Sequence, residues 1–219
     1  MNFTKFKYLQ QTKRFHDTKY KEKGMQFQRT YPNEDVIRFV NKYFSKKKGF
    51  FLDVGCGNGR NMVDKRFIFD GCDASENLVE ICQNKGLNVI NSDCCNLPYN
   101  DNSYDYVMNI AVLHHLSTKE RRVKCINELK RVCKTKGKII ITVWSWEFYK
   151  NKYENKDAFV DWPLHKRFTE TGNKDELYTR YYHFFEKNEI INLIKNINNL
   201  NIVDIYFEHE NWIIILEKI

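Results

Sequence analysis

The stretch FLDVGCGNG, Phe51 to Gly59, decides the fold of this 219-residue chain. An apolar run ends at Asp53, and Gly55, Gly57 and Gly59 follow at every second position. The run predicts a buried strand, and the glycines let the backbone of the next turn approach a ligand closely at the carboxyl edge of a parallel sheet. We therefore expect an α/β protein with a ligand site where this strand ends.

Strand-like and helix-like segments alternate along the rest of the chain. The predicted strands are 49–54, 67–73, 88–93, 104–110, 138–144, 201–207 and 211–218. The predicted helices are 33–44, one that begins at Ser75, 117–135 and 186–197. Ser117 to Glu120 forms an S-x-x-E capping box at the start of the third helix, and residues 150–176 are interpreted as a polar connection.

This alternation predicts one α/β domain over residues 33–219. It consists of a seven-stranded, mostly parallel, Rossmann-like sheet with helices on both faces and a C-terminal antiparallel hairpin. Residues 1–32 are interpreted as a basic N-terminal extension. Residues 1–50 carry 13 Lys and Arg against 4 Asp and Glu, interleaved with aromatic residues. This composition suits a surface that binds phosphates and bases, and a solvated tail would also have it.

Cysteine usage and hydropathy indicate the compartment. The seven cysteines form no C-x-x-C pair, which disfavours a disulfide framework and a zinc knuckle and indicates reducing conditions. No apolar run approaches the length that spans a bilayer. We expect a cytoplasmic protein that binds neither a metal nor a membrane.

Acidic residues end the first three predicted strands, at Asp53, Asp73 and Asp93. A carboxylate at Asp73 can accept both hydroxyls of a ribose, and Asp93 with the next backbone N–H can read an adenine edge. A pyrophosphate cradle is disfavoured, because Arg60 stands where the dinucleotide fingerprint requires glycine. A nucleoside site without a phosphate site fits S-adenosyl-L-methionine.

This ordered set of residues resembles the class I S-adenosylmethionine-dependent methyltransferases over about residues 33–147. A narrower resemblance covers roughly residues 50–219. This part of the chain looks like the eukaryotic tRNA methyltransferases that esterify 5-carboxymethyluridine at the wobble position. The motifs that carry the resemblance are, in order, GCGNG with an unusually short helix after it, GCDAS, NLVEIC, IAVLHHLSTKERR, VWSWE, RYYHFF and NWIIILEK. The resemblance implies methyl transfer to the wobble carboxylate of tRNA and a small zinc-binding activator subunit. The residues expected to bind the donor are Asp53, Gly55, Cys56, Gly57, Asn58, Gly59, Asp73, Ala74, Asp93, Cys94 and Ile110.

The acceptor chemistry distinguishes this reaction from other methylations of nucleic acid. Residues 109–112 read NIAV, not the Asn/Asp-Pro-Pro-aromatic motif of enzymes that methylate exocyclic amines. Cys94 and Cys95 stand beside the expected adenine reader, so they are expected to line that pocket and not to attack a pyrimidine ring. A carboxylate is already ionised at neutral pH, so its methylation requires alignment and desolvation but no general base.

The residues expected to orient the acceptor are His115, Arg121, Arg180 and His183. His114 and His115 follow the fourth strand, where we expect one ring to pack and the other to contact substrate. Arg121 and Arg122 lie in the first turn of a helix, where the macrodipole disfavours cations. They therefore need a partner, either an acidic neighbour such as Glu120 or a phosphate or carboxylate of the substrate.

Two other functions fit the same sequence. Asp73 is followed by Ala74 and Ser75, without the arginine that family members often carry there. Residues 30–39, TYPNEDVIRF, resemble bacterial small-molecule methyltransferases. The first alternative is a methyltransferase for a small carboxylic acid. The second is a non-catalytic subunit that binds nucleic acid or a partner and has a methyltransferase fold.

Overall fold

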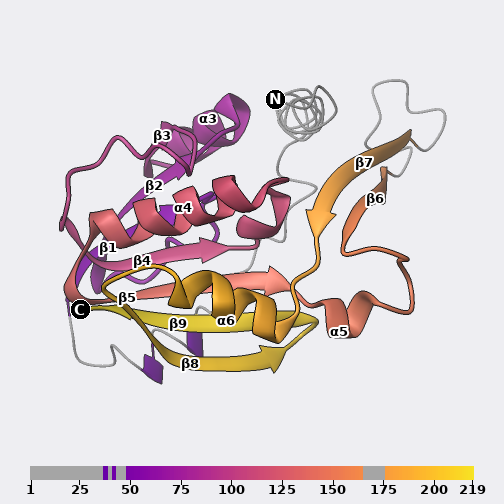
Figure 1. Ribbon diagram of the computed structural model, residues 1–219. Coiled ribbons are helices and arrows are strands. Elements are labelled where there is room, and N and C mark those ends of the chain that lie inside the picture. Colours follow the sequence, from indigo (N-terminus) through magenta and orange to yellow (C-terminus); the bar gives the residue numbers. More distant parts are fainter. Residues whose placement is uncertain (1–36, 39–40, 43–47, 165–175) are drawn as a thin grey trace.

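The structure, a computed structural model, describes residues 37–38, 41–42, 48–164 and 176–219 (Figure 1). Residues 37–38 and 41–42 are helical and belong to the predicted helix 33–44. The other residues of that helix and the N-terminal extension 1–32 lie outside the described residues. In the part of the chain that is described, no helix combines the length and the apolar character needed to cross a membrane.

A seven-stranded sheet forms the centre of the molecule, in the strand order β3-β2-β1-β4-β5-β9-β8. Its strands are β1 (Gly49–Val54), β2 (Phe67–Asp73), β3 (Asn88–Asn91), β4 (Tyr104–Ile110), β5 (Cys133–Trp144), β8 (Leu200–Glu208) and β9 (Asn211–Lys218). Neighbours from β3 to β5 are parallel, and β9 is antiparallel to both β5 and β8. The predicted sheet with its C-terminal hairpin is confirmed.

Helices cover both faces of this sheet (Figure 1). On one face, α4 (Lys119–Val132) and α6 (Lys187–Lys195) bury Leu129 and Ile194 in the largest apolar cluster. On the other face, α3 (Glu76–Asn84) packs Val79 and Cys82 against Val89 of β3. Lys42 also contacts the sheet, because its ammonium lies 2.9 Å from the carboxylate of Asp204 on β8. Burial of apolar side chains on both faces is what a parallel sheet requires.

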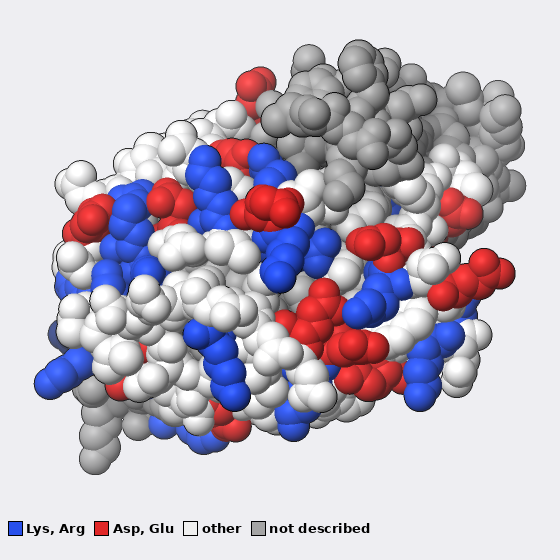
Figure 2. Space-filling view, viewed as in Figure 1, with Lys and Arg blue, Asp and Glu red and all other residues white. Residues whose placement is uncertain are grey.

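Charged side chains are mixed over the described part of the surface. Figure 2 shows acidic and basic groups interspersed on one face. The sequence has the same balance, because residues 51–219 carry 23 Lys and Arg against 24 Asp and Glu.

Three local predictions were wrong: the bounds of the helix predicted at 117–135, the short helix after GCGNG, and the polar connection at 150–176. The helix α4 begins at Lys119, and Thr118 is its N-cap, because Thr118 Oγ1 accepts the Arg121 N–H at 3.2 Å. The capping box at Ser117 is therefore not formed. The same helix ends at Val132, since the chain enters β5 at the next residue. Residues 55–66 contain turns and no helix, because this short glycine-rich connection lacks an apolar face that a helix could bury.

The third error concerns residues 150–176, which were interpreted as a polar connection. β6 (Asp157–Leu164) and β7 (Glu176–His183) form a separate two-stranded antiparallel sheet. This hairpin stands beyond the carboxyl end of β5 (Figure 1). Val160 and Tyr182 pack there with Tyr149 of α5 (Trp146–Tyr149). Charged and aromatic residues are mixed in these segments, so the alternation typical of a strand was not recognised in the sequence. The two strands are stabilised by aromatic packing against a separate segment.

Gly55 and Gly86 offer a matched test of the turn after β1. Both have left-handed φ angles, +78° and +75°. A Cβ at Gly55 would lie 2.3 Å from Val112 Cγ2, whereas a Cβ at Gly86 would meet nothing within 4 Å. Gly86→Ala should cost about 1–2 kcal/mol of unfolding free energy. Gly55→Ala should cost a further ~1–3 kcal/mol through overpacking against a stiff β-branched side chain. Urea denaturation measures both, and equal losses would contradict the close approach.

Candidate active site

The strand order reverses between β1 and β4, since the chain passes from β1 outward to β2 and β3 before it returns to β4. Ligands of open α/β sheets bind outside the carboxyl ends of the strands at such a reversal. Ala111, directly after β4, has a left-handed φ of +59°. Its N–H donates to Thr142 Oγ1 at 3.0 Å. Strained backbone of this kind concentrates at functional sites, and no sequence signal had indicated it.

Asp73 fixes the glycine turn that follows β1. Its Oδ2 accepts the Gly57 N–H, and its Oδ1 accepts the Ser75 N–H, each at 2.9 Å. The Gly55 N–H donates to the Cys72 carbonyl at 2.7 Å. The turn is therefore held against the end of β2. Each oxygen of a carboxylate can accept a second hydrogen bond, so Asp73 can also bind hydroxyl groups of a ribose.

Asp53 is fully buried at the end of β1, and neither carboxylate oxygen accepts a hydrogen bond of good geometry from the described residues. Burial and the negative charge of Asp73 raise the pKa of Asp53 to about 7. The nearby Arg60 and Asn61 side chains lower it only in part. A buried carboxylate whose charge is only partly offset favours a cationic ligand, because an adjacent positive charge stabilises its ionised form. The amino group of an amino-acid ligand has this chemistry.

Asp93, after β3, pairs with Arg121 of α4. The Arg121 Nη2 lies 2.8 Å and 3.0 Å from the two carboxylate oxygens, and Oδ1 also accepts the Cys95 N–H at 2.9 Å. Although burial opposes ionisation, these contacts lower the pKa of Asp93. Arg121 thus lies on the donor side of the site. The sequence analysis expected either an acidic neighbour or a substrate group as the partner of Arg121. The partner is an acidic residue, Asp93, in place of the suggested Glu120.

The other residues expected at the donor site lie around the same carboxyl ends. Cys56, Asn58 and Gly59 are buried in the turn after β1, Ala74 is exposed beside Asp73, Cys94 is partly buried beside Asp93, and Ile110 is buried at the end of β4. The glycine backbone, the buried Asp53 carboxylate and the two further carboxylates could together hold a donor, and we call them the donor set. These groups match the amino acid, ribose and adenine of S-adenosyl-L-methionine.

The two histidines after β4, in the short helix η1 (Leu113–His115), have different environments. His114 is buried, and its Nδ1 accepts the Trp144 N–H at 3.2 Å. The Nδ1–H of His115 donates to the Tyr181 carbonyl at 3.0 Å, because a carbonyl can only accept. Burial and the positive charge of Arg180 lower the pKa of His115 to about 4, although the bond to Tyr181 opposes the shift. The ring of His115 is therefore neutral at neutral pH.

Alternation along β7 separates its side chains into two groups. Arg180 and Tyr182 lie on the side of the histidines. Burial lowers the pKa of both His114 and His115, and the charge of Arg180 adds to each shift. The Tyr182 ring lies 4.5 Å from the His115 ring. Tyr181 and His183 lie on the other side of the strand. Arg180 therefore lies near the two histidines, whereas Arg121 pairs with Asp93 and the His183 ring contacts Asp157 and Glu189.

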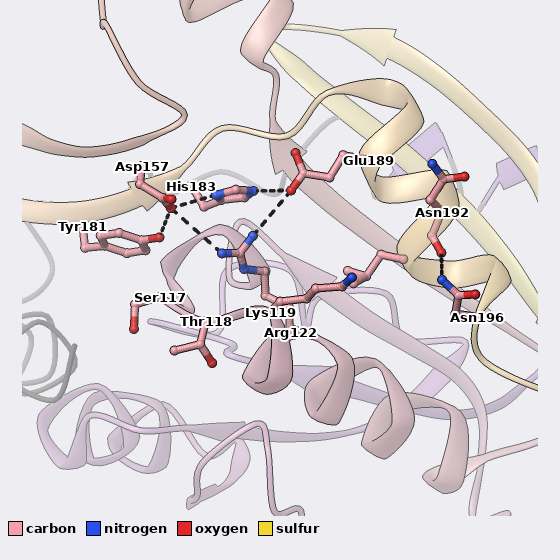
Figure 3. A pocket seen from close by; sticks show the side chains of 11 residues that line it. Ser117, Thr118, Lys119, Arg122, Asp157, Tyr181, His183, Glu189, Asn192 and Asn196 are labelled. Atoms are coloured by element: carbon pink, nitrogen blue, oxygen red, sulfur yellow. Dashed lines mark hydrogen bonds and ion pairs between the residues drawn. The ribbon is translucent and has the colours of Figure 1, made fainter. Parts of the chain in front are cut away.

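His183 lines a cavity of about 520 Å³ between α4, α6 and the hairpin (Figure 3). Its Nδ1 lies 2.8 Å from Asp157 Oδ1, and its Nε2 lies 2.7 Å from Glu189 Oε1. The buried Arg122 guanidinium faces the same two carboxylates at 4.0 Å and 3.7 Å. Tyr181 donates its hydroxyl to Asp157. Burial would raise the pKa of Asp157, but the bonds from His183 and Tyr181 bring it to about 2.

We name these residues, Arg122, Asp157, Tyr181, His183 and Glu189, the hairpin clamp. They come from α4, β6, β7 and α6 and fasten the hairpin to the main domain. The Arg122 Nε also donates to the Leu116 carbonyl at 3.0 Å. The sequence analysis expected an acidic or a substrate partner for Arg122. The facing groups are acidic, but they are Asp157 and Glu189, which the sequence analysis had missed. The positions of Asp157 and Glu189 in the sequence do not indicate that the two carboxylates lie close to Arg122 and His183.

The chain is similar to known methyltransferases. A family profile described as a methyltransferase domain matches residues 52–141. A tRNA (carboxymethyluridine(34)-5-O)-methyltransferase of Schizosaccharomyces pombe is 32% identical, over 76% of this chain and 80% of the relative. The chain belongs to the family of the tRNA (carboxymethyluridine(34)-5-O)-methyltransferases. An enzyme of the same name from Xenopus tropicalis is 29% identical over 79% of this chain, and the match spans only 36% of that longer relative.

Solved structures show the same fold. An S-adenosylmethionine-dependent methyltransferase from Clostridium acetobutylicum superposes with a TM-score of 0.65 at 15% identity, over 84% of this chain and 89% of that one. A Haloferax volcanii methyltransferase, solved in complex with the Trm112 activator, gives a TM-score of 0.61 at 12% identity, over 84% and 88% of the two chains. At these identities the likeness concerns the fold alone.

Asp53 predicts an unusual dependence of stability on pH. Folded Asp53 holds its proton up to about pH 7, whereas the unfolded carboxyl loses it near its usual 3.8. Between these values the folded state binds more protons, so the free energy of unfolding falls as pH rises, by up to about 4 kcal/mol. Asp53→Asn should remove this decline and be more stable than the wild type at pH 8. Urea denaturation of the ligand-free chain from pH 4 to pH 8 measures it, and parallel pH profiles would refute the assignment.

The hairpin clamp predicts a stability role for His183. His183→Ala removes the ring that lies between the carboxylates of Asp157 and Glu189. The loss should be about 1–3 kcal/mol of unfolding free energy at pH 7, less than the ~3–5 kcal/mol for breaking a fully buried pair, because Asp157 is partly solvated. Chemical denaturation measures the change. A loss under about 0.5 kcal/mol, the size of ordinary surface substitutions, would show that the clamp does not hold the hairpin.

Proposed function

We propose that this chain is an S-adenosyl-L-methionine-dependent methyltransferase that esterifies the carboxylate of 5-carboxymethyluridine at the wobble position of tRNA, in the cytoplasm. One observation carries the proposal: a family relative of similar length, named for this reaction, is matched over 80% of its chain. The donor set at the reversal of strand order supports it independently, since Asp53, Asp73 and Asp93 meet there.

The donor residues have distinct proposed roles. Asp73 binds the ribose hydroxyls, Asp93 reads the adenine edge together with the following N–H, and Asp53 pairs with the amino group of the donor. The glycine backbone from Gly55 to Gly59 lets the ligand approach without a side chain in the way. The bound donor supplies a methyl group on a sulfonium. Arg121 orients Asp93 through its pair of contacts.

The acceptor side needs alignment and not proton transfer. An acceptor carboxylate is ionised at neutral pH, and His115, with its pKa near 4, is neutral there. We propose that Arg180 binds the acceptor carboxylate and that His115 contacts the uridine. Tyr182 lies stacked on Trp144 with ring centroids 4.3 Å apart, and these rings exclude water from the carboxylate. His183 acts indirectly, by holding β7 in place.

Contacts with tRNA and with a partner complete the proposal. The described surface in Figure 2 mixes both signs of charge, so we propose that residues 1–32 supply many of the phosphate contacts. We also propose a small zinc-binding activator subunit. The Haloferax volcanii methyltransferase forms a complex with the Trm112 activator. Here Ile90, on the edge strand β3, and Ile68, on the neighbouring strand β2, are 37% and 61% exposed. Exposed apolar residues at a sheet edge suit a protein partner.

The test is nucleoside mass spectrometry of tRNA that contains 5-carboxymethyluridine, after incubation with the full chain and donor, with and without a candidate activator. A methyl ester at the wobble uridine supports the proposal, and dependence on the added subunit supports the partner. If no ester forms while calorimetry detects donor binding, the tRNA acceptor is wrong. Small carboxylic acids are then the next acceptors to assay.

Arg180 predicts a specific loss of acceptor use. Arg180→Gln should lower kcat/KM for the tRNA by about 10- to 100-fold, because a hydrogen bond to a charged group contributes ~1.5–3 kcal/mol. Its donor affinity should stay unchanged. Arg66→Gln is the matched control, since Arg66 pairs with Asp64 at the surface. Equal effects of the two substitutions, or a loss of donor binding in Arg180→Gln, would refute the assignment.

A further inference from the structure

Three thiols and a carboxylate meet at the end of β3, and the proposed methyl transfer does not use them as a group. A carboxylate oxygen of Asp93 and the sulfurs of Cys94 and Cys95 all lie within 4.8 Å of one another. The Cys125 side chain, on α4, lies beside the Cys94 thiol. We propose that this group, the thiol cluster, is a binding site for a thiophilic divalent cation such as Zn²⁺, and that the cation competes with the methyl donor.

The ligand types select the class of metal. Thiolates are soft ligands that favour Zn²⁺, Cd²⁺ and Cu⁺ over Mg²⁺ or Ca²⁺. Zinc–sulfur bonds are about 2.3 Å long, so two thiolates on one tetrahedral zinc lie about 3.8 Å apart. The observed spread of up to 4.8 Å therefore closes with side-chain shifts of about 1 Å. Cys125 offers the fourth position of a tetrahedron.

The surrounding charges suit a bound cation. Asp93 and the thiolates of Cys94, Cys95 and Cys125 would bring four negative charges, of which Zn²⁺ and Arg121 together offset three. Arg121 lies 2.8 Å from Asp93 Oδ2, and a carboxylate has enough lone pairs to bind a metal and a guanidinium at once. Arg121 then fills the place of an outer partner that orients a metal ligand.

A metal here affects the donor because both need Asp93. The competition, unlike the site itself, rests on the proposed function, which assigns Asp93 to the adenine. Metal coordination turns the carboxylate and the neighbouring backbone toward α4 and withdraws them from the nucleoside. By linkage, the donor must weaken the metal by the same factor as the metal weakens the donor.

Calorimetric titration of the reduced full chain with ZnCl₂ tests the site, and ultraviolet thiolate-to-metal absorption with CdCl₂ reports sulfur ligation. We expect one equivalent to bind. Cys125→Ser and Cys133→Ser are matched, since both replace a fully buried thiol. Cys125→Ser should weaken zinc about 100-fold or more, at least the effect of losing an outer partner, and Cys133→Ser should leave it unchanged. Cys95→Ala is a second test that does not alter α4, and circular dichroism verifies that each variant folds.

Donor binding is measured first, without metal, so that the two proposals fail separately. A donor concentration about 100 times its Kd should then weaken zinc about 100-fold. Absence of zinc binding, or equal affinity in Cys125→Ser, Cys95→Ala and Cys133→Ser, overturns the site. Zinc binding that the donor does not alter overturns the competition. If the donor itself does not bind, the proposed function falls, and the cysteine variants alone decide the metal site.

Discussion

The turn after β1 depends on the absence of a side chain at Gly55. With φ at +78°, this residue passes so close to Val112 that an added Cβ would lie 2.3 Å from Val112 Cγ2. The connections that follow β1 and β4 meet at this contact, where the order of the parallel strands reverses. Because the turn is tight, its N–H groups reach Cys72 and Asp73 at the end of β2. The close approach therefore places the glycine turn against Asp73.

The carboxyl group of Asp53, buried at the start of the same turn, is costly to ionise. Asp73 and Asp93 accept hydrogen bonds of good geometry, whereas buried Asp53 accepts none of that quality from the described residues and has a pKa near 7. Proteins tolerate such groups at sites where a ligand supplies the missing charge. A cationic amino group that binds beside Asp53 would restore the balance. The difference between these three carboxylates thus points to the orientation of the donor.

The β7 strand connects the acceptor side to the rest of the domain. One of its faces carries Arg180 and Tyr182 toward His115, and the other carries Tyr181 and His183 into the hairpin clamp. The Tyr181 carbonyl in turn sets which nitrogen of His115 carries the proton. The clamp and the acceptor residues therefore share one strand, and a change in the ion network alters the geometry of the acceptor site through the backbone.

Sequence alone determined the main strands, the glycine turn and the three carboxylates that end consecutive strands, because apolar period and strand ends are local properties of the chain. Only the tertiary structure decided the partner of Arg121, the carboxylates around His183, the β6–β7 hairpin and the meeting of Cys125 with Cys94. These contacts join residues from about 6 to 31 positions apart. Spacing predicts the face or end on which a residue lies, but not which side chain from another segment packs opposite it.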